Sequence, residues 1–283
     1  MNIKSVSLMV LLILSLNTIL FSSDKVITMG YKDISKMPLI GNKHDNSGLY
    51  FDMFRKAANR IGYKLKIVRY PKKRIHAGLK DGSIDFYPGS SFSQKRAEYL
   101  YYLPNGLNTK EVLITLNNKS EIFDMTKAKG TLIVERGSSK LEWNKIYANL
   151  KIIELGELSI QKVIKALKMN RGDFYIADIE VVDYHKKISN TNNYSEMNIK
   201  IHTMAINKEY IPMYLGFSNK SKLFKEKTNL NYDKNKIISI ANNPITIDKK
   251  SVAYKFFIAL DELKKEKTTH KLYNKYFKTT NNK

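Results

Sequence analysis

The hydrophobic pattern of the first hundred residues alternates between a helical and a strand-like period. Apolar residues between Tyr50 and Ile61 recur at helical spacing, which predicts an amphipathic helix that Gly62 ends. Short β-forming segments lie on either side of it, and a further helix and strand follow; these strands are expected at 26–31, 64–70 and 84–87, and the helix at 73–80. Strands that alternate with helices indicate an α/β fold with a parallel sheet.

A second series of the same kind begins after residue 130. It predicts strands at 131–134, 151–155 and 173–178, and helices at 140–149, 160–167 and about 179–187, the middle helix capped by Ser159. Strand-like segments at 111–116 and 211–218 are expected to connect the two series, and another strand is expected at 199–206. The chain closes with helical patterns at 253–263 and 272–277, whereas 222–250 is polar and poorly patterned.

Two series joined by two crossings predict two lobes. Lobe 1 is expected to comprise 24–113 and 217–283, and lobe 2 to comprise 114–216. Residues 1–23 are typical of a signal peptide, with a charged start, an apolar stretch and small residues near a cleavage point. The mature protein is therefore expected to be exported to the periplasm.

The net charge of +23 changes this picture little, because the lysines are spread along the whole chain. No run of five basic residues and no RNP-like or zinc-finger pattern is present, so we expect a solvated lysine surface and no nucleic-acid partner. The absence of cysteine excludes disulfides, cysteine-based metal sites and a cysteine nucleophile. The five histidines show no metal-ligand spacing, and we expect neither a metal nor a cofactor.

The stretch 84–98 carries candidate chemistry. It predicts a buried strand, a Gly/Ser turn and a helix that starts after Ser93 and carries Arg96. Such a turn directs backbone N–H groups and the positive end of a helix dipole at one point, where hydroxyls and a guanidinium favour a carboxylate. The alternative is an ordinary strand-to-helix turn with a surface arginine.

The order of these motifs resembles the extracytoplasmic solute-binding proteins of ABC transporters, in particular the polar amino-acid type known as family 3. The resemblance covers about 26–221 and 251–278, and it is carried by Gly30-Tyr31, by the stretches 80–86, 89–98, 135–139 and 172–178, and by the closing helix 268–277. It implies a type II periplasmic binding protein-like fold, with two α/β lobes, two crossing strands and a ligand cleft. It also implies a monomer that delivers a small amino acid-like or carboxylate ligand to an inner-membrane permease.

The resemblance assigns roles to individual residues. Arg96 and Ser91 would hold the α-carboxylate of an amino acid, and Asp178 would hold its α-ammonium. Four further residues are expected to line the same site: Gly89, Ser90, Ser138 and Ser139.

The sequence also departs from the family. Segment 32–38 lacks the aromatic residue that usually stacks on the ligand, so Tyr31 is the candidate substitute. The frequent Trp after the second-strand proline is replaced by Lys72, and Arg74 is a candidate for reaching the cleft. Segment 222–250 has no counterpart.

Two other functions stay open at this stage. A few relatives of the fold are dehydratases of cyclic acids, and Asp178 or Glu135 would then be the general acid. A ligand-sensing module without transport is the second alternative. Because no catalytic dyad occurs at firm spacing, we expect a binding protein rather than an enzyme.

Overall fold

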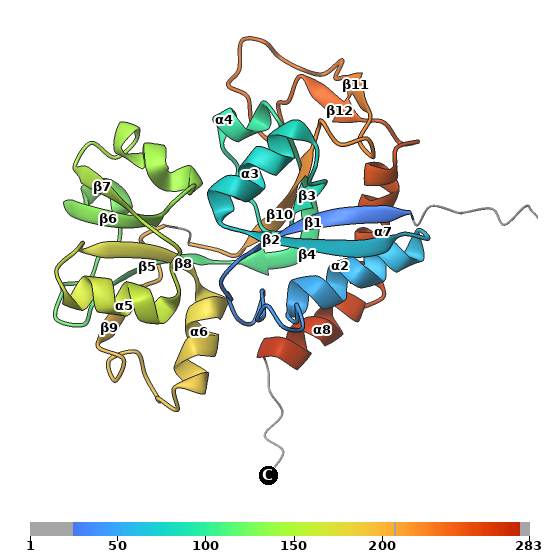
Figure 1. The fold of residues 1–283 in the computed structure, drawn as a ribbon. Helices are drawn as coiled ribbons and strands as arrows, with labels where there is room; N and C mark the ends of the chain where they lie inside the picture. The colour runs from blue at the N-terminus through green and yellow to red at the C-terminus, as the bar shows by residue number, and fades with distance from the viewer. Residues whose placement is uncertain (1–24, 207, 278–283) are drawn as a thin grey trace, which may run out of the picture.

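The computed structural model describes residues 25–206 and 208–277, which form two α/β lobes side by side (Figure 1). The predicted signal peptide lies outside the described residues. The fold class predicted from the sequence is confirmed. None of the described helices is long and apolar enough to cross a membrane.

Lobe 1 is built on a five-stranded sheet of order β2-β1-β3-β10-β4. Its strands are β1 (Val26–Lys32), β2 (Lys64–Tyr70), β3 (Phe86–Tyr87), β4 (Leu100–Thr109) and β10 (Ile211–Ser218). The first three are parallel, and β10 runs antiparallel to both β3 and β4.

Helices cover both faces of this sheet (Figure 1). They are α2 (Leu49–Arg60), α3 (Lys72–Asp81), the single-turn α4 (Gln94–Ala97), α7 (Val252–Lys265) and α8 (Thr268–Phe277). The apolar stripe predicted on α2 is buried, and Phe54 packs against Phe86 of the sheet and Phe256 of α7. This aromatic cluster fixes β3, the strand that leads into the candidate site.

Lobe 2 repeats the arrangement with the order β7-β6-β8-β5-β9. Its strands are β5 (Glu111–Leu116), β6 (Gly130–Glu135), β7 (Leu150–Leu155), β8 (Phe174–Asp178) and β9 (Ile199–His202), and its helices are α5 (Ile160–Lys168) and α6 (Ile179–Ile188). Two short 3₁₀ helices, Met125–Lys127 and Ser139–Lys145, complete it.

One carboxylate occupies an equivalent place in each lobe. Asp85 accepts a hydrogen bond of 2.6 Å from the backbone N–H of Thr28, and Asp173 accepts one of 2.9 Å from Thr131. Each bond ties the residue that leads into one strand, β3 or β8, to the neighbouring parallel strand, β1 or β6. Two of the motifs that carried the resemblance, 80–86 and 172–178, therefore serve the same structural purpose.

Three predicted elements differ from the structure. The predicted helix 140–149 is a 3₁₀ helix at Ser139–Lys145, the strand 199–206 ends at His202, and the strand 84–87 comprises only Phe86–Tyr87. Ser93 starts α4 without a side-chain capping bond.

The sheets exchange strands at Lys110 and across 203–210. The expected lobe boundaries, 113/114 and 216/217, fall inside β5 and β10, because both segments looked like continuous crossing strands. Residues 219–250 form an extension of lobe 1 that holds a two-stranded sheet, β11 (Glu226–Thr228) and β12 (Ile245–Ile247). The amide of Asn242 orders it by donating to the carbonyls of Asp233, Lys236 and Ile237.

Candidate ligand cleft

A cavity of about 590 Å³ lies between the lobes. The turns that follow β3 and β6 and the end of β8 line it, so the carboxyl ends of strands from both sheets meet there. Ligands bind at this edge of open α/β sheets. The volume falls within the range of pockets that bury a small organic ligand.

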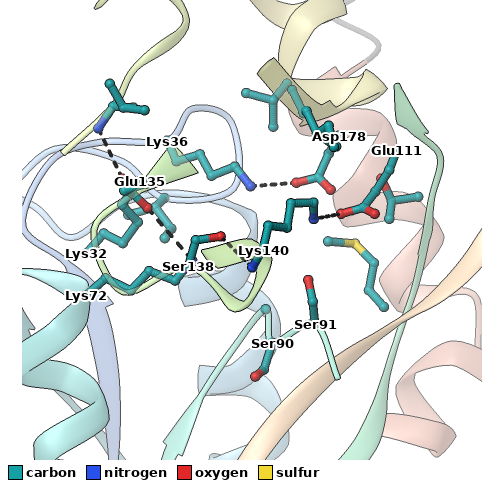
Figure 2. Close-up of a pocket in the computed structure, with 18 of the residues that line it drawn as sticks. Lys32, Lys36, Lys72, Ser90, Ser91, Glu111, Glu135, Ser138, Lys140 and Asp178 are labelled. Carbon is teal, nitrogen blue, oxygen red and sulfur yellow. Dashed lines mark hydrogen bonds and ion pairs between the residues drawn. The ribbon is translucent and has the colours of Figure 1, made fainter. Parts of the chain in front are cut away.

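The charged lining consists of four lysines and three carboxylates from both lobes (Figure 2). Lobe 1 supplies Lys32, Lys36 and Lys72, and lobe 2 supplies Lys140 and the carboxylates Glu111, Glu135 and Asp178. Most of the cationic charge thus faces the anionic charge across the gap between the lobes.

Glu135, at the end of β6, is held by both lobes. Lys32 donates to its Oε1, the Leu158 N–H donates to the same oxygen at 3.1 Å, and Lys72 Nζ lies 3.8 Å from Oε2. Burial alone would raise the pKa of Glu135, but the charges of the two lysines outweigh it and lower that pKa. Glu135 is therefore an anion at neutral pH.

Lys72 is the less well neutralised of these two lysines. Burial lowers its pKa from 10.5 to about 7, and the cations Arg96, Lys32 and Lys36 act in the same direction. Glu135 opposes this shift, but Lys32 already holds that carboxylate more closely.

Asp178 forms the second contact across the cleft, with Lys36 Nζ 2.5 Å from its Oδ2 (Figure 2). Burial opposes ionisation of both groups, yet mutual attraction outweighs it, so the pKa of Asp178 is lowered and that of Lys36 is raised. A third pair, Lys140 and Glu111 at 2.6 Å, lies within lobe 2.

Arg96 bridges the lobes from α4. It is 6% exposed, and its Nη2 donates to the carbonyl of Gly137 at 2.8 Å. Its guanidinium is not part of the cavity lining, although its charge acts on the lining residues Lys72 and Tyr87. Arg96, the residue predicted to hold the carboxylate of the ligand, thus contacts the turn of the opposite lobe.

The structure brings six of the other predicted site residues into the lining: Gly89, Ser90, Ser91, Ser138, Ser139 and Asp178. The hydroxyl of Ser91 points into the cavity and that of Ser90 points away from it (Figure 2). Ser138 accepts a hydrogen bond of 3.2 Å from the N–H of Lys140, which fixes the turn after β6.

Tyr31 and Arg74 lie outside the lining. Tyr31 is fully buried beside Arg69, and its hydroxyl donates to the carbonyl of Leu39 at 3.1 Å. Arg74 lies over the ring of Tyr70, with 4.1 Å from its guanidinium carbon to the ring centroid. Both side chains are held by lobe 1 itself, which is a physical reason for their distance from the cleft.

Sequence reasoning missed most of the charged lining, because single lysines in a lysine-rich chain carry no distinguishing signal. It named Tyr50 only as part of the apolar pattern of α2, whereas this buried ring lines the cavity, where its hydroxyl approaches Gly89. The remaining wall is largely apolar and includes Ile160, Val181, Ile188, Met213 and Ile240. Ile240 comes from the extension 219–250, which sequence patterns left without a role.

No three His, Cys, Asp or Glu side chains within 25–206 and 208–277 gather where they could hold a metal ion. The arrangement instead offers hydroxyl groups, paired charges and an apolar wall, which suit a small organic solute.

The family profile of bacterial extracellular solute-binding proteins, family 3, matches residues 27–279. The chain belongs to this family, and it is a solute-binding protein. Among curated proteins, no sequence match is found.

Solved structures with the same fold cover most of the chain. A substrate-binding protein of an amino acid ABC transporter from Streptococcus pneumoniae, bound to L-arginine, has a TM-score of 0.64 at 16% identity, over 91% of this chain and 96% of that one. An ancestral arginine-binding protein bound to arginine has a TM-score of 0.63 at 18% identity, over 89% and 98%. An ancestral amino acid-binding protein described as a precursor of cyclohexadienyl dehydratase has a TM-score of 0.60 at 16% identity, over 89% of this chain and 95% of that one. At these identities the similarity shows the fold.

Proposed function

We propose that this protein is the periplasmic receptor of an ABC transporter and that it binds an amino acid or a related small carboxylate. The observation that carries the proposal is the cavity between the lobes, lined by charged groups from both. The family supports it, and so do the similar structures, which include the substrate-binding protein of an amino acid ABC transporter.

Binding would stabilise a closed arrangement of the lobes. The contacts of Lys32, Lys36 and Arg96 all run from lobe 1 to lobe 2. A ligand that touches both turns adds to them, and such differential contact shifts the population toward the closed form. Closure then provides the signal that a permease reads.

We further propose that the cleft binds without turnover. A dehydratase needs a general acid that is protonated near neutral pH. The two candidates, Glu135 and Asp178, both have a lowered pKa because lysines hold them as anions. Neither is positioned to donate a proton to a ligand at pH 7.

Titration calorimetry of residues 24–283 against amino acids and small carboxylates tests the function, and the unchanged ligand should be recovered after incubation. Arg96→Met should weaken binding roughly 10- to 100-fold, the equivalent of one lost charge-assisted hydrogen bond. Arg74→Met is the matched control, because that guanidinium lies over Tyr70. Equal affinities of the two variants would contradict the role of Arg96, and recovery of a converted ligand would contradict binding without turnover.

A further inference from the structure

The lining carboxylates are already occupied by the protein's own ammonium groups. Lys36 holds Asp178, Lys140 holds Glu111 at 2.6 Å, and Lys32 holds Glu135. A ligand ammonium needs a carboxylate as its counter-ion in a buried site. It would have to displace a lysine here, and it would enter a cavity already lined by four of them.

The pair at Asp178 is the least favourable one to displace. The side chain of Asp178 is 14% exposed, and Lys36 reaches it from the opposite lobe. Removing one member of such a pair leaves an uncompensated buried charge. A ligand ammonium that replaced Lys36 would leave the lysine in the same cavity, close to the incoming cation.

The cationic charge of the lining is in excess. Four lysines face three carboxylates, and Lys72 shares Glu135 with Lys32, which lies closer to that carboxylate. Lys72 lies 3.8 Å from that carboxylate and has a side chain only 18% exposed. The nearby charge of Arg96 adds to the excess. A buried site of this kind attracts a negatively charged group.

The rest of the lining indicates what the anion carries. The wall formed by Ile160, Val181, Ile188, Met213 and Ile240 is apolar and offers no further charge. The cavity of about 590 Å³ has room for a hydrocarbon or ring attached to the anionic group.

We propose that this cleft selects a small organic acid without a charged amino group, with Lys72 meeting its carboxylate and Lys36 occupying the place at Asp178 that an ammonium would take. This inference rests on the proposed solute-binding function and narrows its ligand class. A change in the protonation of Lys72 follows from it: binding of the anion favours the protonated lysine, so the complex takes up a fraction of a proton near pH 7.

Matched ligands that differ only in the α-amino group test the proposal. Calorimetry at pH 7 would compare 4-methylpentanoate with L-leucine, 3-phenylpropanoate with L-phenylalanine, and glutarate with L-glutamate. At least one acid should bind roughly tenfold or more tightly than its amino acid partner, since one charge-assisted contact contributes about that factor. Buffers of different ionisation enthalpy should report proton uptake with that acid.

Lys36→Met tests the occupied carboxylate directly. It frees Asp178, so the preference for the acid should fall by about tenfold or reverse in favour of the amino acid. Lys43→Met is the matched control, because Lys43 lies in the same loop and pairs with Asp33 at the surface. The control should keep the wild-type preference.

The possible outcomes distinguish failure of this inference from failure of the proposed solute-binding function. Tighter binding of the amino acid by the wild-type protein in every pair would overturn the inference and leave solute binding intact. Tighter binding of the acid without proton uptake would overturn the role of Lys72. Binding of no ligand in either set would overturn both proposals.

Discussion

Lys72 provides the sharpest test of the electrostatics of the cleft. Its pKa is about 7 in the folded protein against an ordinary value of 10.5, and the cause is burial, reinforced by neighbouring cations. Between these two values the unfolded chain binds a proton that the folded chain does not. The free energy of unfolding therefore rises with pH across this window. Lys72 destabilises the folded protein most below pH 7, where the buried lysine must carry its charge.

The two pKa values set the magnitude. A single group of this kind changes the free energy of unfolding by at most about 1.4 kcal/mol per pH unit, and integration from pH 7 to about pH 9 gives about 2 kcal/mol. Lys72→Met should remove this pH-dependent change in the free energy of unfolding. The variant should gain stability relative to the wild-type protein at pH 7, and the difference should shrink by about 2 kcal/mol at about pH 9.

Urea unfolding at several pH values, without ligand, measures this difference. Lys73→Met is the matched control, because Lys73 is the exposed neighbour of Lys72 in α3. Parallel pH profiles for the wild-type protein and Lys72→Met would refute the reasoning, since they would mean that Lys72 stays charged and solvated in the folded protein.

Three further predictions concern other parts of the structure. Glu135→Gln leaves Lys32 buried against a neutral amide and should lower the free energy of unfolding by roughly 3–5 kcal/mol, measured with urea. Gly89→Ala should weaken ligand binding in calorimetry and cost about 1–3 kcal/mol of stability, because its Cβ would lie 2.6 Å from the hydroxyl of Tyr50. His76→Gln should flatten the loss of stability on acidification: burial lowers the pKa of His76 from 6.5 to about 2, so the unfolded chain takes up a proton below pH 6.5 that the folded chain refuses.

Each of these variants has a control at a comparable but exposed or open position. Glu154→Gln breaks the surface pair with Arg136 and should cost less than about 1 kcal/mol. Gly156→Ala adds a Cβ where nothing lies within 4 Å. His270→Gln removes an exposed histidine and is the control for the buried His76. A control that matched its test variant would contradict the corresponding explanation.

The sequence predicted the fold well because period and order are local signals. The stripe on α2 and the strand-to-helix order of both lobes follow from spacing alone, and these elements are present. The turns that line the cleft were also predicted, since Gly89 and Ser138 belong to motifs of fixed spacing.

The chemistry of the cleft was harder to predict because it depends on contacts between distant residues. Lys36 and Asp178 are 142 positions apart, and Lys32 and Glu135 are 103 apart. Nothing in the local sequence distinguishes Lys36 from Lys43, although one bridges the lobes and the other lies at the surface. Tyr31 shows the opposite error, because this conspicuous aromatic near the end of the first strand is packed inside lobe 1.

The division of charge between the lobes has a consequence for the empty protein. Lys32 and Lys36 of lobe 1 are the counter-ions of Glu135 and Asp178 of lobe 2, so these contacts draw the two cleft edges together before any solute arrives. Added electrolyte screens such attraction over about 8–10 Å at physiological strength, although contacts as buried as that of Lys32 with Glu135 are screened less. Ionic strength should therefore act on the resting position of the lobes, and the solute needs to supply only the remaining part of the free energy of closure.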